Sequence, residues 1–179
     1  ADEAHDFPMD LSPWVDEKII KEFVPGSLDP CYKTTEGGKE LLCLRNDIAP
    51  LVLWYNKTLM DQFGYKVPTT WEEYIALSDE VARDHPGYYL GSAGSPEVNF
   101  FWPSGCPMAH EIDADTVHID TSDSKCTRVT KMLDHMIANG TLSKYGQFDP
   151  KFIEIANNNK LLLMESANWF GDFVFGGKP

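Results

Sequence analysis

The hydrophobic pattern of the chain predicts short strands separated by helices. Continuous apolar runs at 51–55 and 161–164 have the length of strands, and the first is suited to a strand buried on both faces. Two shorter strands are expected at 88–90 and 116–119. Because segments of helical pattern separate these runs, the sequence predicts an α/β layered fold with a mainly parallel sheet.

Two helices are expected after the first strand. One spans about 57–63 and ends at Gly64, a residue suited to a helix C-terminus. The next begins at Thr70, whose hydroxyl can cap the backbone while Glu73 reaches back, which is the pattern of a capping box. Its apolar face is expected to contain Trp71, Tyr74, Ile75, Ser78 and Ala82.

Two further helices are expected in the second half of the chain. A long one runs from a cap at Ser122 or Asp123 to Gly140, and Asp149-Pro150 opens a shorter one. The apolar face of the long helix is expected to contain Val129, Met132, Leu133, Met136 and Ile137.

The first 46 residues show less regular patterning. Residues 1–30 indicate an irregular surface segment with one short helix at about 15–23, which Pro25-Gly26 ends. Residues 31–46 predict a hairpin that turns at Glu36-Gly37-Gly38-Lys39. The sequence opens on Ala1 and stops at Pro179, and we expect both ends to be cut from a longer protein.

Acidic residues outnumber basic ones, and this limits the classes of partner that are expected. Lys and Arg number 15 against 28 Asp and Glu, which gives a formal net charge of −13. Such a surface repels phosphate backbones and anionic lipid headgroups, so nucleic acid and membrane-surface partners are not expected. No apolar run approaches the ~18–20 residues of a spanning helix.

The four cysteines indicate disulfides rather than a metal or redox motif. None belongs to a CxxC pair, and four cysteines allow three connectivities. Cys31 and Cys43 flank the expected hairpin turn, while Cys106 and Cys126 flank a turn and a short strand, so sequential pairing is favoured. The alternative is four buried free thiols in a cytosolic protein. Disulfides would place the protein outside the cytoplasm.

Motifs for catalysis, metals and cofactors are missing from the sequence. The five histidines show no metal-binding spacing, and Asp113-Ala114-Asp115 lacks the glycine and the distal glutamate of a calcium loop. Gly91-Ser92-Ala93-Gly94-Ser95 matches neither a nucleophile elbow nor a phosphate loop. A pair of acids for glycoside hydrolysis stays open as an alternative, although no spacing singles one out. We expect no metal and no cofactor.

Aromatic residues lie at strand ends and in connections, where flat rings can pack on the C–H faces of sugars. For Trp54, Phe101 and Trp102 core packing is the preferred interpretation. Trp169 follows the last strand through polar residues 165–168, which indicates a loop position at a cleft.

Three stretches resemble the family 1 extracellular solute-binding proteins, which include maltose-binding protein. Leu53-Trp54-Tyr55-Asn56-Lys57 is similar to the family's strand ending in Tyr-Asn-Lys, and 64–73 is similar to its Gly, then Pro-x-Thr-Trp-x-Glu helix opening. Residues 159–169 resemble its late strand, which ends in a short loop with Trp. The four cysteines are not part of the family pattern.

The resemblance implies a truncated periplasmic-binding-protein-like (type II) fold that is mostly the second of two α/β lobes. Residues 1–48 would be the end of the first lobe and the crossing segment, and 49–179 part of the second lobe. A mono- or oligosaccharide would bind between the lobes, whose closure signals to an ABC permease in the membrane. The ligand-binding residues implied are Trp169, Asp47, Glu97 and Asn99.

The function expected is therefore an extracytoplasmic receptor for a sugar, lipid-anchored in the full-length protein, and not an enzyme. The alternatives are a carbohydrate-active enzyme, which would use a carboxylate pair, and a surface interaction module with an aliphatic cleft.

Overall fold

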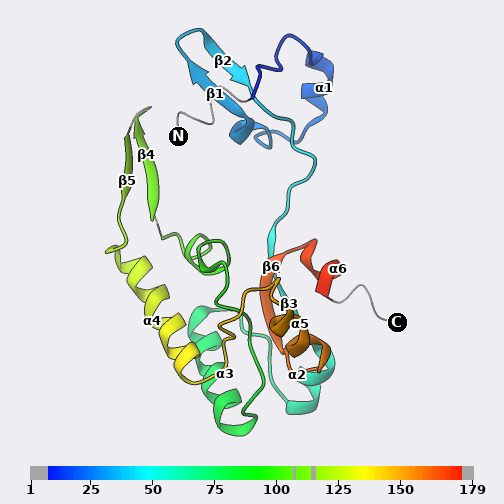
Figure 1. The fold of residues 1–179 in the computed structure, drawn as a ribbon, viewed down its shortest axis with the longest axis vertical. Coiled ribbons are helices and arrows are strands. Elements are labelled where there is room, and N and C mark those ends of the chain that lie inside the picture. Colours follow the sequence, from blue (N-terminus) through cyan, green and yellow to red (C-terminus); the bar gives the residue numbers. More distant parts are fainter. Residues whose placement is uncertain (1–7, 107, 114–115, 175–179) are drawn as a thin grey trace. The chain divides into compact units, whose positions relative to one another are not determined.

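The computed structural model describes residues 8–106, 108–113 and 116–174 (Figure 1). The chain divides into two compact units, Ala1–Ala49 and Pro50–Pro179. The lobe boundary expected between residues 48 and 49 stays a prediction. Among the helices described, none combines the length and the apolar character needed to cross a bilayer.

The N-terminal unit is a small assembly of one helix and one hairpin. Helix α1 (Glu17–Glu22) begins where the Asp16 carboxylate accepts a hydrogen bond from the Lys18 amide. Strands β1 (Tyr32–Thr35) and β2 (Gly38–Leu41) pair antiparallel, and a 3-10 turn, η2 (Asp29–Cys31), precedes them. The predicted short helix and hairpin are both confirmed. The buried core consists of Leu28, Cys31 and Leu41.

The second unit carries the remaining elements in α/β order. They are β3 (Leu51–Tyr55), α2 (Lys57–Phe63), α3 (Trp71–Asp84), η3 (Glu97–Phe101), β4 (Ala109–Asp113), β5 (Thr116–Ile119), α4 (Ser124–Ala138), α5 (Pro150–Asn157), β6 (Leu163–Ala167) and α6 (Phe170–Val174). The element η3 is a short π-helix.

The sheet of this unit is mixed. Strand β3 pairs antiparallel with β6, so that Leu53 lies opposite Glu165. Beyond β6, Tyr89 bridges Leu161 in parallel, and Ser92 bridges Ser143 in parallel. The described strand pair β3-β6 is thus antiparallel, and the two isolated bridges that adjoin it are parallel. The second unit is mixed α/β, as the predicted fold class requires.

The two faces of the sheet pack against different helices. Leu53 and Leu163 belong to the larger core with α2, α3 and α4, while Trp54 and Met164 pack with α5 and α6. This separation follows from the alternation of side chains along each strand. Figure 1 shows helices on either side of β3 and β6.

One half of the predicted capping box at Thr70 is present, and the other half is replaced by a different contact. The Thr70 hydroxyl accepts a hydrogen bond from the Glu73 amide at 3.1 Å, as expected. The Glu73 carboxylate instead accepts from the backbone and hydroxyl of Thr69. Gly64 ends α2 in the left-handed region, with φ of 73°. Asp149 caps α5 through the Lys151 amide.

Several expectations about burial were wrong. Strand β3 is not buried on both faces, because 51–54 are only partly buried and Tyr55 is 50% exposed. On α3 the expectation holds in part: Tyr74 and Ser78 are buried, and Trp71 and Ile75 pack partly buried against the core. The buried face also includes Leu77 and Val81. Ile137 is 43% exposed on α4, and Trp102, expected in the core, is 64% exposed.

The expected disulfides are both present. Cys31 pairs with Cys43, and Cys106 pairs with Cys126. The second closes a loop that holds the β4–β5 hairpin, whose first strand the sequence analysis missed. Ala114 and Asp115, which belong to the stretch compared with a calcium loop, lie outside the described residues. Within the described residues no group of three or more potential ligands is placed to hold a metal ion.

Candidate functional site

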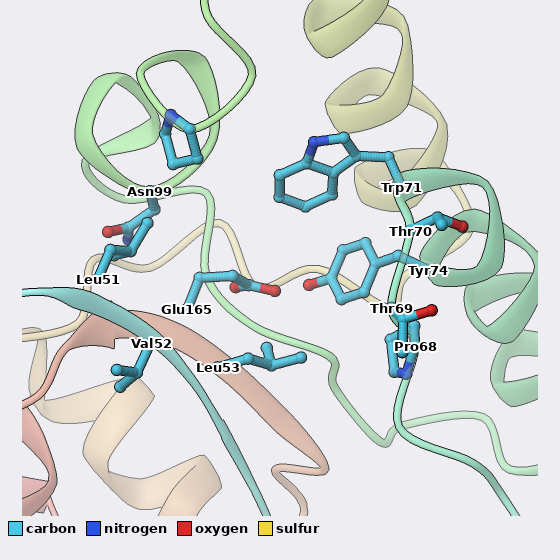
Figure 2. Close-up of a pocket in the computed structure, with 11 residues that line it drawn as sticks. Leu51, Val52, Leu53, Pro68, Thr69, Thr70, Trp71, Tyr74, Asn99 and Glu165 are labelled. Carbon is cyan, nitrogen blue, oxygen red and sulfur yellow. The ribbon is translucent and has the colours of Figure 1, made fainter.

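A cavity of about 320 Å³ lies in the second unit beside β3 and the start of α3 (Figure 2). Its walls come from β3, the residues before α3 and its first turn, the π-helix with the residues after it, and β6. The lining residues are Leu51, Val52, Leu53, Pro68, Thr69, Thr70, Trp71, Tyr74, Asn99, Pro103 and Glu165. Apolar side chains predominate, and a few polar groups point into the space, as in many ligand pockets.

Glu165 is the ionisable acid of this cavity. It projects from β6 and is only 4% exposed, yet neither carboxyl oxygen has a hydrogen-bond partner in the described residues. Burial raises the pKa of its carboxyl group from 4.5 to about 7, and the nearby Tyr74 hydroxyl opposes this rise. The group is therefore a neutral acid over most of the range below pH 7.

The backbone beneath Glu165 is held by Gln147. The Gln147 amide donates to the Glu165 carbonyl oxygen at 2.7 Å and accepts from the Ser166 hydroxyl at 3.0 Å. Because these polar groups are buried and paired, they fix the position of β6. The Glu165 side chain thus projects from a well-anchored strand, with the Tyr74 hydroxyl as its polar neighbour.

Tyr74 lies next to Glu165. Figure 2 shows its hydroxyl and the Glu165 carboxyl group pointing toward each other. The hydroxyl donates a hydrogen bond to the Leu90 carbonyl oxygen. Burial, with the neighbouring Glu165 as a smaller cause, raises the pKa of Tyr74 well above 10. The hydroxyl thus stays neutral, and its oxygen can accept a hydrogen bond from a protonated Glu165.

Asn99 reaches the same cavity from the π-helix Glu97–Phe101. It is 3% exposed, and its side-chain nitrogen has no hydrogen-bond partner among the described residues. Its neighbour Phe100 is fully buried, with its ring 5.9 Å from that of Trp71. A π-helical turn is a local irregularity often found at functional sites, and here it directs two successive side chains inward.

The arrangement can bind a ligand through three kinds of group. Glu165 offers a carboxyl group, Asn99 offers N–H donors, and Trp71 offers a flat ring. The described lining contains one carboxylic acid, whereas glycoside hydrolysis normally uses two.

The raised pKa of Glu165 predicts a specific pH dependence of stability. Between pH 4.5 and 7 the folded state keeps a proton that the unfolded chain has lost, so this group lowers the free energy of unfolding as pH rises. The total loss is about 3 kcal/mol, complete above pH 7. Urea unfolding of Glu165→Gln and wild type should diverge by this amount in favour of the variant from pH 4 to pH 8. Parallel pH profiles would contradict this expectation.

The structure places the four predicted ligand residues in different settings. Asn99 lines the cavity with Glu165. Trp169, 41% exposed, lies in the turn between β6 and α6 with its ring 5.8 Å from that of Phe170, outside the described lining. Asp47 is exposed in the N-terminal unit, and the Glu97 side chain lies outside the described part of the chain. Their grouping therefore stays a prediction.

Sequence reasoning missed Glu165, Tyr74 and Trp71 as site residues. Residues 165–168 were expected to form a polar loop, but β6 runs to Ala167 and both Glu165 and Ser166 are buried. One available signal was the acid two residues after Leu163, the spacing that puts both on one face of a strand.

Comparisons with solved structures identify the architecture. The galacto-N-biose-/lacto-N-biose I-binding protein of an ABC transporter from Bifidobacterium longum matches with a TM-score of 0.75 and 20% identity, over 94% of this chain and 42% of that one. A sugar transporter from Arthrobacter chlorophenolicus with bound laminaribiose matches with a TM-score of 0.71 and 16% identity, over 96% and 45%.

A third similar structure is the GacH receptor of Streptomyces glaucescens, determined unliganded and with acarbose. It has a TM-score of 0.66 and 17% identity, over 98% of this chain and 44% of that one. The chain has the periplasmic-binding-protein fold. It spans less than half the length of these neighbours. No protein-family model matches the sequence, and no curated protein matches it.

The periplasmic-binding-protein fold agrees with the mixed sheet of the second unit. Identities of 16–20% establish this fold and leave the ligand to be argued from the chain's own residues.

Proposed function

We propose that the chain is part of the extracytoplasmic substrate-binding component of an ABC transporter for a mono- or oligosaccharide. The observation that carries the proposal is the fold shared with solved ABC-transporter binding proteins in complex with lacto-N-biose and with cycloalternan, and with a sugar transporter that has laminaribiose bound. The maltose-binding-protein-like resemblance of residues 53–57, 64–73 and 159–169 points to the same class.

The proposed arrangement assigns residues 1–48 to the end of the first lobe and the crossing segment, and 49–179 to part of the second lobe. The sugar would bind between lobes at Trp169, Asp47, Glu97 and Asn99. Trp169 supports this role because its half-exposed ring follows β6 directly. Binding would favour the closed state that a membrane permease recognises.

An extracytoplasmic location fits the two disulfides, which persist in oxidising compartments. We propose that the full-length protein is a lipid-anchored lipoprotein at the cell surface or in the periplasm.

A binding role fits the site better than the enzymatic alternative. A glycoside hydrolase would place two carboxyl groups about 5–10 Å apart across the substrate. Among the described residues that line the cavity, Glu165 alone carries a carboxyl group.

The proposal predicts that Trp169→Ala weakens sugar binding by the full-length protein about 10-fold or more, because a stacked ring is lost. Tryptophan fluorescence and calorimetry with a panel of mono- and oligosaccharides measure this change. The matched control is Trp14→Ala, since Trp14 is 73% exposed in the N-terminal unit. A panel that gives no response with the wild type, or an unchanged affinity in Trp169→Ala, would argue against the proposal.

A further inference from the structure

We propose that the Glu165 cavity is a second binding site, separate from Trp169, for a small uncharged polyhydroxylated molecule such as a single sugar ring or a polyol. The inference goes beyond the proposed function, because it rests on the residues of the second unit alone.

The first argument is the state of the polar groups. Neither Glu165 oxygen nor the Asn99 side-chain nitrogen makes a hydrogen bond of good geometry to another described residue, although buried polar groups in folded proteins are normally paired. A protonated Glu165 can donate to the Tyr74 oxygen beside it, and this leaves its second oxygen and the Asn99 nitrogen in need of partners. Both residues line one cavity. A ligand with hydroxyl groups would supply the missing partners to both residues at once.

The second argument concerns the charge of the ligand that would fit the cavity. A neutral Glu165 can donate and accept, and Asn99 presents N–H donors, so together they match hydroxyl groups, which also do both. An ammonium group would face the Asn99 donors, and an anion would face the Glu165 acid in its ionised form. An uncharged ligand avoids both conflicts.

The third argument is the shape and surface of the walls. Leu51, Leu53 and Pro103 offer apolar contact, and the Trp71 indole offers a flat face. C–H groups of a sugar ring or polyol chain pack on such surfaces. A volume of about 320 Å³ is at the small end for ligand pockets, which favours one ring over an oligosaccharide.

The cavity and Trp169 are separate in structure. Glu165 lies on the face of β6 that packs toward α3, and Trp169 lies in the turn that leads into α6, outside the described lining. The two sites therefore differ in Trp169 and Glu165, while Asn99 is the residue that both would use.

The test uses the full-length protein carrying Trp169→Ala, so that the proposed interlobe sugar site is already weakened. Calorimetry and saturation-transfer NMR with glucose, galactose, glycerol and inositol should detect saturable binding of at least one compound. Adding Glu165→Met should lower that affinity at least 10-fold while the free protein becomes more stable to urea, because an unpartnered buried acid is replaced by an apolar side chain of similar length.

The opposite signs of these two effects separate a ligand-binding role from a structural one. The matched control is Trp14→Ala, which should leave the affinity unchanged. The proposal is overturned if none of the compounds binds, if Glu165→Met leaves the affinity intact, if choline binds in preference to the polyols, or if only ordered water fills the cavity.

Discussion

Replacing Gly94 with alanine should destabilise the second unit by about 3 kcal/mol or more. A β-carbon at Gly94 would overlap the Cα atom of Gly146 and lie 3.1 Å from its nitrogen. Backbone cannot rotate away as a side chain can, so the two segments would have to separate. Overpacking alone typically costs about 1–3 kcal/mol, and here parallel pairing is also lost.

The separation would break specific hydrogen bonds. The Ala93 amide donates to the Ser143 carbonyl oxygen at 2.7 Å, and the Ser92 hydroxyl donates to the Tyr145 carbonyl oxygen at 2.6 Å. Urea or thermal unfolding followed by circular dichroism measures the loss. Gly146→Ala is the matched control, because a β-carbon there meets nothing within 4 Å. Equal stability of the two variants would show that the segments do not approach as described.

Removing the Cys31–Cys43 disulfide should unfold the N-terminal unit while the second unit stays folded. The bridge closes a 12-residue separation, and loops of this size stabilise a domain by about 3 kcal/mol. The unit ends at residue 49, and its buried hydrophobic core is Leu28, Cys31 and Leu41. Units this small rarely have more than about 3–5 kcal/mol of stability from their core.

Hydrogen exchange of the double variant Cys31→Ala/Cys43→Ala should show loss of protection across β1 and β2, where Tyr32 pairs with Leu41. The matched control is Cys106→Ala/Cys126→Ala, which removes a bridge of 20-residue separation from the larger unit. That variant should keep the protection of β1 and β2. Retained protection in the first variant would mean that the hairpin does not depend on its bridge.

Much of the fold was predictable because its signals are local. Thr70 and Gly64 mark helix ends through their own backbone and hydroxyl chemistry, so α2 and α3 were placed correctly. Cys31 and Cys43 flank a tight hairpin, so their pairing follows from chain geometry over a few residues.

The cavity was not predictable because it depends on contacts far apart in sequence. Glu165 meets Tyr74 only after β6 has paired with β3. Asn99 points inward because of a π-helical turn, for which the apolar spacing of 97–101 gives no signal. Trp102, the first residue after this turn, is 64% exposed.

The pairing of β3 with β6 also determines when the second unit can finish folding. Leu51 lies opposite Ala167, so the first strand of the second unit waits for most of that unit to be made before its partner leaves the ribosome. Such non-local pairing slows folding, because a long loop must close first. The sheet of the second unit is therefore complete only when the C-terminal part of the unit is present.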